Sequence, residues 1–404
     1  MAVFIKMKMN PENKIIKIIP VIIICAIFII LFIQMLSRAG NNDFTSYMLS
    51  SKALLENTNP YNTGSPFPYV YPLTLAFILI PFTLLPDIPL QILWFILNVF
   101  FLYKIFEWTI CHAEFKIDKG KYFFVLIFLI FYLNIIQNNL LNGQINIFLL
   151  FLCCLFYVNY KKSNTFLTSL FLSIAISVKL VPVFLLLYLL IRKEYKLIMY
   201  VVFLTFIFIL LPVVIIGENI FTYYNFYFQK FLSANLSPAL NEEYQSGMFY
   251  SLTGLIKFIN PVLTAGLLPT IICLAVVMLF FILTDKYYIK NNKTLIFFLY
   301  LCGFLLISPV SETHHLIFLG PLIILILADY WINYRQKTYL DYIVLLIVII
   351  LLFAGKNYHY LYFPMIVISM VLFIKNILTV DSRLPDPLLS EVNRGADLQG
   401  NDKL

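Results

Sequence analysis

Charged residues are scarce in this chain. Only 12% of its 404 residues are Asp, Glu, Lys or Arg, whereas a soluble domain carries about 25%. Hydrophobic residues make up 62%, and apolar runs of about 20 residues recur along the whole length. The shortage of charge argues against a soluble enzyme, and the runs predict a polytopic α-helical membrane protein. Because they do not alternate with a period of two, an outer-membrane barrel is not expected.

Motifs for metals and nucleotides are also missing. The six cysteines form no CxxC pattern, and Cys153 and Cys154 are adjacent, which makes them poor disulfide partners. No glycine-rich nucleotide-binding loop occurs. The net charge of +8 comes from basic residues spread over short loops, where they indicate membrane orientation. We therefore expect no cofactor and no nucleic-acid partner.

The apolar runs predict about twelve transmembrane spans. They lie near residues 15–36, 88–110, 121–138, 144–160, 164–178, 180–191, 197–216, 264–284, 293–307, 315–334, 341–354 and 361–378. The outer turns near 139–143 and 308–313 carry no Lys or Arg, and the positive-inside rule then places both termini in the cytoplasm. This orientation requires the short segment 71–86, which contains two prolines, to lie as a helix in the outer interface.

Two long outer loops follow from this topology, at about 37–87 and 217–263. Within the first, residues 44–57 have apolar residues at helical spacing, which predicts an amphipathic helix on the outer leaflet. Residues 1–380 are expected to form a single transmembrane domain. Residues 381–404 are polar and are expected to form a disordered cytoplasmic tail.

Polar clusters gather on the outer side of this topology. Asp43 either caps the 44–57 helix or acts as a catalytic base. The stretch Asn142-Gly143-Gln144-Ile145-Asn146 is either a tight turn or a source of amide hydrogen bonds to sugar hydroxyls. Lys179 either snorkels to the interface or pairs with a lipid phosphate.

Two further clusters lie on the same side. His314 and His315 are adjacent, so they lack the i, i+4 spacing of a helical zinc site; phosphate contact or acid/base work suits them better than metal binding. Glu312 precedes them. Gln245 lies in Glu242–Ser246 of the second outer loop, which is either a solvated loop or part of a site. The convergence of all five clusters indicates a site at the outer interface.

Several short motifs occur in one order over residues 40 to 320. They are Asp43-Phe44 with Tyr47 and Ala53, Asn59-Pro60-Tyr61, Tyr69-Val70-Tyr71-Pro72 with Pro81 and Leu85-Pro86, Gly143-Gln144-Ile145-Asn146, Lys179-Leu180-Val181-Pro182, and Ser308-Pro309 with His314-His315. In this order they resemble the family 87 glycosyltransferases, which have the GT-C membrane fold. Two elements depart from the family pattern: Leu73 follows Tyr71-Pro72 where the family often has a second proline, and an Asn-Gln-Ser-like element occurs only as Tyr244-Gln245-Ser246.

The resemblance implies a GT-C-like bundle with interfacial helices in the first outer loop. It also implies transfer of a hexose, often mannose, from a polyprenyl-phosphate donor to a glycan or glycolipid acceptor. The reaction would take place at the outer face of the plasma membrane. A transporter or flippase of a lipid-linked saccharide is the alternative, and it would place charges near the centres of the spans.

The resemblance places the catalytic acidic residue at Asp43, which we expect to take a proton from the acceptor hydroxyl while the anomeric configuration inverts. The expected partners of the leaving phosphate are Lys179, His314 and His315. The expected sugar and acceptor contacts are Tyr61, Tyr69, Gln144, Asn146, Gln245 and Glu312.

Overall fold

The computed structural model describes residues 14–112, 120–232, 251–252, 267–288, 293–306, 312–355 and 361–375. Within these ranges the regular structure is entirely helical, and no strand occurs. The prediction of an all-α fold is therefore confirmed. The predicted tail, 381–404, lies outside the described residues.

In chain order the helices are α1 (Lys14–Ser37), α2 (Asp43–Leu55), α3 (Leu73–Leu79), η2 (Ile80–Leu84), α4 (Asp87–His112), α5 (Lys121–Leu141), α6 (Asn146–Lys161), α7 (Thr165–Val178), η3 (Val181–Phe184), α8 (Leu185–Ile191), α9 (Tyr195–Leu210), α10 (Val213–Ile216), α11 (Asn219–Tyr227), η4 (Phe228–Leu232), α14 (Leu267–Tyr288), α15 (Lys293–Gly303), η8 (Phe304–Leu306), η9 (Thr313–Leu319), α16 (Gly320–Ile332), η10 (Tyr334–Gln336), α17 (Tyr339–Ala354) and α18 (Tyr362–Phe373).

Long apolar helices make the chain an integral membrane protein. Five helical segments in the described ranges are long and apolar enough to cross a bilayer: Ile18–Ser37, Asp87–Cys111, Lys121–Leu141, Tyr195–Ile216 and Thr313–Ile332. Within the described residues every predicted span falls on helical segments, but α6, α7 and several others have only 10–17 residues. Because a crossing helix needs about 20 residues, helix length supports five spans, and the number twelve stays a prediction.

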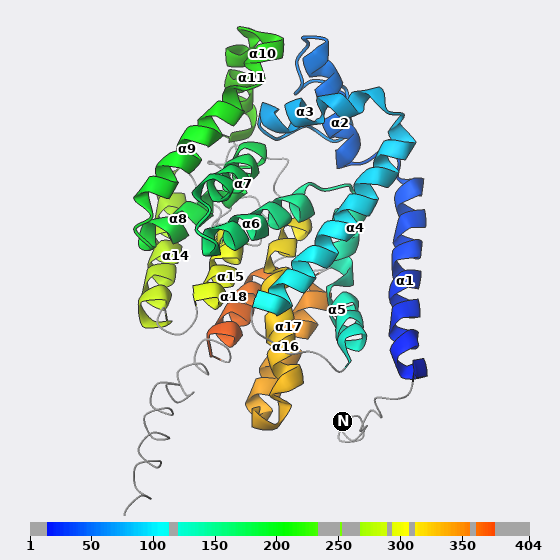
Figure 1. Ribbon diagram of the computed structural model, residues 1–404, viewed down its shortest axis with the longest axis vertical. Helices are drawn as coiled ribbons and strands as arrows, with labels where there is room; N and C mark the ends of the chain where they lie inside the picture. Colours follow the sequence, from blue (N-terminus) through cyan, green and yellow to red (C-terminus); the bar gives the residue numbers. More distant parts are fainter. Residues whose placement is uncertain are drawn as a thin grey trace, which may run out of the picture.

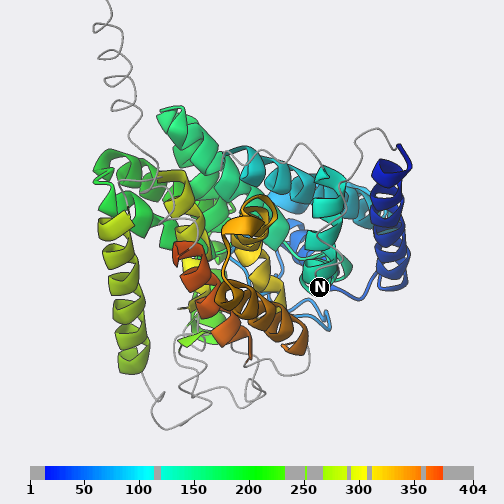
Figure 2. The same cartoon turned by 90° about the horizontal axis from the view of Figure 1, so that it is seen from below.

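The helices form one bundle with a group of short helices at one end. Helices α2, α3, α10 and α11 lie together at the top of Figure 1, where α2 contacts both α3 and α10. Helix α1 lies at one edge of the bundle beside α5, and α14 lies at the opposite edge (Figures 1 and 2). Helix α16 is buried along nearly its whole length and contacts α4, α5 and α18.

The segment between α1 and α4 contains the two predicted helices. Residues 73–84 form α3 and η2, a unit too short to cross a membrane. Helix α2 matches the helix predicted at 44–57, but its apolar side does not face the leaflet as expected. Phe44, Tyr47 and Met48 are buried, because Phe44 stacks on Trp94 and Tyr47 packs edge-on against Tyr71.

Helix α11 packs on the segment that follows α2. The Asn219 amide in α11 donates a hydrogen bond to Asn57 Oδ1 at 3.0 Å, and the Tyr223 hydroxyl donates to the Asn57 carbonyl at 3.1 Å. The Tyr61 ring stacks on the ring of Phe226 in the same helix. These contacts attach α11 to the loop that follows α2.

Four helix ends meet beneath this group of short helices. They are the start of α2, the turn between α5 and α6, the break between α7 and η3, and the start of η9. Helices α5 and α6 both contact η9, and α7 contacts α3. Each of these helix ends carries one of the predicted polar clusters, so the bundle brings together segments far apart in the sequence.

A buried ion pair joins α8 to α14. Arg192 Nη1 donates to Asp285 Oδ1 at 2.9 Å, and the two side chains are 6% and 1% exposed. The Tyr300 hydroxyl of α15 donates to the other carboxylate oxygen at 3.2 Å. Removing one member of such a pair is costly because the remaining charge is buried without its partner.

We predict that Arg192→Ala lowers the free energy of unfolding by about 3–5 kcal/mol, because Asp285 is then left as a buried, unpaired carboxylate. Thermal unfolding in detergent measures the effect. The double variant Arg192→Met/Asp285→Leu removes both charges and should recover most of the loss. Lys104→Ala, which breaks a half-exposed pair with Glu107, is the matched control and should unfold like the wild type. An Arg192→Ala protein as stable as this control would contradict the prediction.

Candidate functional site

Asp43 is the first residue of α2, and its carboxylate is not the cap of that helix. The cap is Asn42, whose side-chain oxygen accepts the Thr45 N–H at 3.0 Å. The capping interpretation of Asp43 is therefore wrong, because the preceding residue already satisfies that N–H group. The Asp43 backbone N–H donates instead to the Asn142 carbonyl at 3.1 Å.

Gln144 holds the Asp43 carboxylate. Its amide Nε2 donates to Asp43 Oδ2 at 2.6 Å. Gln144 is only 3% exposed, and its Oε1 is buried with no hydrogen-bond partner among the described residues. A buried acceptor without a partner is unfavourable, so this oxygen is available to a ligand hydroxyl.

The turn before Gln144 needs a glycine. Gly143 has a φ of +62°, and a Cβ at this position would lie 2.6 Å from Phe44 Cβ. A larger residue would meet both the backbone strain of the left-handed region and a clash with α2. Glycine therefore allows the turn to pack directly against the start of α2, where Asp43 lies.

Burial and a neighbouring carboxylate change the acidity of Asp43. Its pKa rises from the usual 3.8 to about 6, first because burial disfavours the charged form and second because Glu312 is negatively charged. The positive charge of Lys179 and the Gln144 hydrogen bond oppose this rise. Burial also raises the pKa of Glu312. Asp43 is thus a carboxylate that takes up a proton readily near neutral pH.

Lys179 lies at the break between α7 and η3 and contacts three side chains. Its Nζ donates to Asn146 Oδ1 at 2.9 Å and lies 2.7 Å from His315 Nε2. The same nitrogen lies 5.2 Å from the centre of the Tyr71 ring, a geometry typical of a cation–π contact. Burial lowers the pKa of Lys179 to about 8, although Glu312 and Asp43 attract its positive form.

The contacts of His315 select one tautomer. The Glu312 backbone N–H donates to His315 Nδ1 at 3.0 Å, so Nδ1 carries no proton. The proton of a neutral His315 then lies on Nε2, which faces Lys179 Nζ. With its pKa lowered to about 8, Lys179 exchanges between its charged and neutral forms near neutral pH, and only the neutral amine can accept this proton. An anion in place of His315 as its partner would favour the charged form.

His314 faces Glu312 rather than Lys179. Its Nδ1 lies 3.4 Å from Glu312 Oε2, and its backbone carbonyl accepts the Asn139 amide at 3.0 Å. Both histidines are buried. No group of three His, Cys, Asp or Glu side chains that could hold a metal occurs in the described part of the chain.

The two tyrosines expected to contact sugar are buried in the segment between α2 and α3. The Tyr61 hydroxyl donates to the Tyr71 carbonyl at 3.1 Å, and the Tyr69 hydroxyl donates to the Pro72 carbonyl at 2.7 Å. Tyr69 also accepts the Ala76 N–H at 3.1 Å. These bonds position the loop around α3, and a role in sugar binding stays a prediction.

The structure brings most of the predicted site residues together. Direct contacts link Asp43 to Gln144, join Lys179 to Asn146 and His315, and place His314 beside Glu312. Gln245 lies outside the described residues, so the fifth cluster is not placed.

Two site residues were not singled out from the sequence. Arg38 Nη1 donates to Asn142 Oδ1 at 3.0 Å, and the Asn139 oxygen accepts the Asn146 amide at 3.4 Å. The predicted topology places Arg38 at the outer end of a span, which is unusual under the positive-inside rule, and this was the available signal for Arg38. Asn139 stands out only as one polar residue among several near the end of an apolar helix.

Comparison with known families finds one match. The sequence model described as "Glycosyltransferase family 87" matches residues 69–309, which is more than half of the 404 residues. The matched region includes Gln144, Asn146 and Lys179, whereas Asp43 lies 26 residues before its start and Glu312 three residues after its end. No curated protein and no solved structure matches the chain.

The raised pKa of Asp43 predicts a pH-dependent effect on stability. Because the folded pKa, about 6, exceeds the usual 3.8, the folded state favours protonated Asp43, and this stabilisation is lost as pH rises through 6. We expect Asp43→Asn, which is always neutral, to melt at a higher temperature than the wild type at pH 8. The difference should shrink at pH 5.

Thermal unfolding in detergent at the two pH values tests this, with Glu56→Gln as the control. Glu56 is the exposed C-cap residue of the same helix, so its neutralisation should leave the pH profile unchanged. An Asp43→Asn protein less stable than the wild type at pH 8 would mean that the bonds to the ionised carboxylate outweigh its burial.

Proposed function

Because the chain belongs to glycosyltransferase family 87, we propose that it moves a hexosyl unit from a polyprenyl-phosphate donor to an acceptor hydroxyl, with inversion at the anomeric carbon. Family membership makes it a glycosyltransferase, with a sugar donor and an acceptor as substrates. The observation that supports the specific reaction is the placement of Asp43, a carboxylate held by Gln144 in an electrostatic cluster with Glu312 and Lys179.

Asp43 is the proposed general base. The acceptor hydroxyl gives its proton to the Asp43 carboxylate as its oxygen forms a bond to the anomeric carbon. The bond between that carbon and the phosphate oxygen breaks, and polyprenyl phosphate leaves with the bonding electron pair. A base works best when its pKa lies near the working pH, and a pKa of about 6 for Asp43 suits this role.

Lys179, His314 and His315 are the proposed partners of the leaving phosphate. Negative charge grows on the phosphate as the bond breaks, and hydrogen-bond donors already in place stabilise it. The protonated Nε2 of His315 and the Lys179 amine lie within 2.7 Å of each other, so one phosphate oxygen can contact both. Asn146 holds Lys179 in this position.

The proposed sugar and acceptor contacts remain those indicated by the sequence. Gln144 offers the unpartnered Oε1, and Asn146 and Glu312 lie in the same cluster. Tyr61 and Tyr69 donate hydrogen bonds to the carbonyls of Tyr71 and Pro72 and so hold the segment that leads into α3. Gln245 is proposed on its sequence position alone. Mannose is the sugar that we favour, and a glycan or glycolipid is the acceptor.

We propose that the site opens at the outer face of the plasma membrane, with both termini in the cytoplasm. The distribution of basic residues supports this orientation. The twelve-span GT-C topology belongs to the same proposal. It is supported by the coincidence of each predicted span with a helical segment.

We predict that Asp43→Asn lowers kcat by about 10²–10⁴ while donor binding is retained, because the amide cannot accept the acceptor proton. The assay measures transfer of radiolabelled mannose from polyprenyl-phosphate mannose with the full-length protein in nanodiscs. Wild-type kcat/KM should fall about tenfold per pH unit below pH 6, as Asp43 becomes protonated. Glu56→Gln is the control. Near-normal turnover by Asp43→Asn would exclude Asp43 as the base.

A further inference from the structure

Asn139 lies where the two halves of the candidate site meet. It is in the last turn of α5 and is 1% exposed. Its main-chain carbonyl accepts the N–H of Gln144, the residue that holds the candidate base, at 2.9 Å. Its side chain bonds instead to the His314 carbonyl and to Asn146. One buried residue therefore contacts both the base segment and the segments that hold the proposed phosphate partners.

The partners of the Asn139 amide fix its orientation. Its Nδ2 donates to the Ile135 carbonyl at 2.9 Å and to the His314 carbonyl at 3.0 Å. A main-chain carbonyl only accepts hydrogen bonds, so the NH₂ group must face both of them. Turning the amide over would place its oxygen against two carbonyl oxygens. The Asn139 Oδ1 therefore faces the other way, toward Asn146 Nδ2 at 3.4 Å.

The orientation of Asn139 determines that of Asn146. Because Asn139 Oδ1 can only accept, Asn146 has to turn its NH₂ group toward it. The Asn146 oxygen then faces Lys179 Nζ at 2.9 Å. Asn146 is fully buried, so its amide has to find its partners within the site. Lys179 is thereby given an acceptor oxygen, which favours the charged form of an amine.

We propose that Asn139 is a positioning residue for the phosphate partners. Its side chain sets the orientation of the Asn146 amide and so keeps Lys179 ready to bind the donor phosphate as a cation. Asn139 acts through Asn146 and does not touch the substrate. The proposal rests on the proposed transfer reaction, since the phosphate belongs to the proposed donor.

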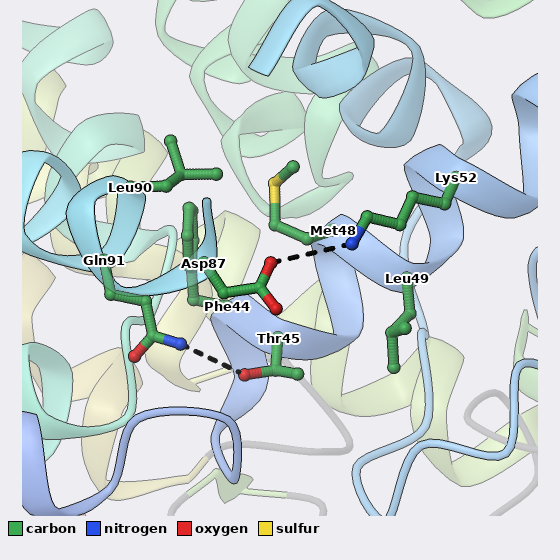
Figure 3. A pocket seen from close by; sticks show the side chains of 8 residues that line it. All are labelled: Phe44, Thr45, Met48, Leu49, Lys52, Asp87, Leu90 and Gln91. Atoms are coloured by element: carbon green, nitrogen blue, oxygen red, sulfur yellow. Dashed lines mark hydrogen bonds and ion pairs between the residues drawn. The ribbon is translucent and has the colours of Figure 1, made fainter. Parts of the chain in front are cut away.

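The base half of the site does not depend on the Asn139 side chain. The bond to Gln144 uses the main chain of Asn139 and is kept when the side chain is replaced. The start of α2 is also held from its other side, where Gln91 Nε2 of α4 donates to Thr45 Oγ1 at 3.5 Å (Figure 3). Replacing the side chain should therefore affect the phosphate partners without moving the base.

The charge of Lys179 gives the proposal a pH signature. Its pKa is about 8, and loss of the acceptor oxygen should lower this pKa by about one pH unit. At pH 6 the amine is then still charged, so the environment of the base is unchanged. The titratable groups around Lys179 stay in place in the Asn139 variants: Asp43, Tyr71, Glu312, His314 and His315.

The test uses Asn139→Leu and Asn139→Ser in the full-length protein in nanodiscs. Leucine matches the volume of asparagine without its polar atoms. A serine hydroxyl can still bond to the carbonyl four residues earlier, but it is too short to reach Asn146. In both variants the KM for polyprenyl-phosphate mannose should rise about fivefold more at pH 8 than at pH 6, because the charged fraction of Lys179 falls. The fall in kcat/KM below pH 6 should stay as in the wild type.

A second measurement follows Lys179 without any substrate. Lys179 is partly exposed, so competitive labelling with acetic anhydride over a range of pH, read by mass spectrometry, gives its titration. The midpoint should fall by about one pH unit in both variants. Asn98→Leu is the matched control. Asn98 is 2% exposed, its amide donates to the Trp94 carbonyl four residues earlier, and its Oδ1 has no hydrogen-bond partner among the described residues. Its replacement should change neither the titration nor the KM.

The outcomes distinguish this proposal from the proposed function. Transfer by the wild type, with the pH dependence of KM and the Lys179 titration unchanged in both variants, would overturn the positioning role alone. A lower melting temperature with an unchanged Lys179 titration, or failure of both variants to fold, would assign Asn139 to folding only and would also overturn it. Absence of transfer by the wild type would overturn the proposed function. The labelling would then decide the role of Asn139, which a lowered midpoint supports and an unchanged one contradicts.

Discussion

The close packing of the Asn142–Gln144 turn against the start of α2 positions the rest of the site. The Asn142 carbonyl accepts the Asp43 N–H, and Gly143 allows the turn to contact Phe44 closely. The Gln144 amide donates to the Asp43 carboxylate. The turn joins α5 to α6, which are central to the bundle, while α2 belongs to the loop outside it. Asp43 is thereby fixed to the turn between two helices of the bundle, which gives it the rigidity that a catalytic group requires.

Burial away from water shifts the pKa values of the charged residues around Asp43. Asp43 and Glu312 are two carboxyl groups with raised pKa values, and Lys179 is an amine with a lowered one. In water the pKa values of all three groups would lie close to their usual values. In the folded protein the pKa of each group also depends on the charge of its neighbours in the cluster. Protonation of one group therefore changes the proton affinity of the other two. If the donor is the anionic polyprenyl phosphate proposed above, its binding would enter the same balance and would change the readiness of Asp43 to accept a proton.

Hydropathy and the positions of basic residues were sufficient to predict the helical segments and to place four polar clusters at one end of the bundle. The sequence was less informative about which side chain caps α2 and about what covers its apolar face. Asn42 and Asp43 are both good N-cap residues, and only the backbone geometry decides that Asn42 is the cap. The apolar face of α2 has the spacing of a lipid-facing helix, but Trp94 and Tyr71 cover it. The bond from Gln144 to Asp43 joins residues 101 positions apart, and no sequence pattern indicates it; the predicted contact of Gln144 with sugar stays a prediction.

The shortness of α6 has a consequence for how lipid reaches the site. With 16 residues, this helix is about 24 Å long, whereas the hydrocarbon layer is about 30 Å thick. When Lys161 and Lys162 at its carboxyl end extend to one headgroup layer, its other end lies below the opposite layer. Asn146 and Lys179 are then recessed into the leaflet, and the bilayer must thin locally around them. If the donor is the polyprenyl phosphate proposed above, its phosphate would reach Lys179 within the leaflet and would not have to rise into the aqueous phase.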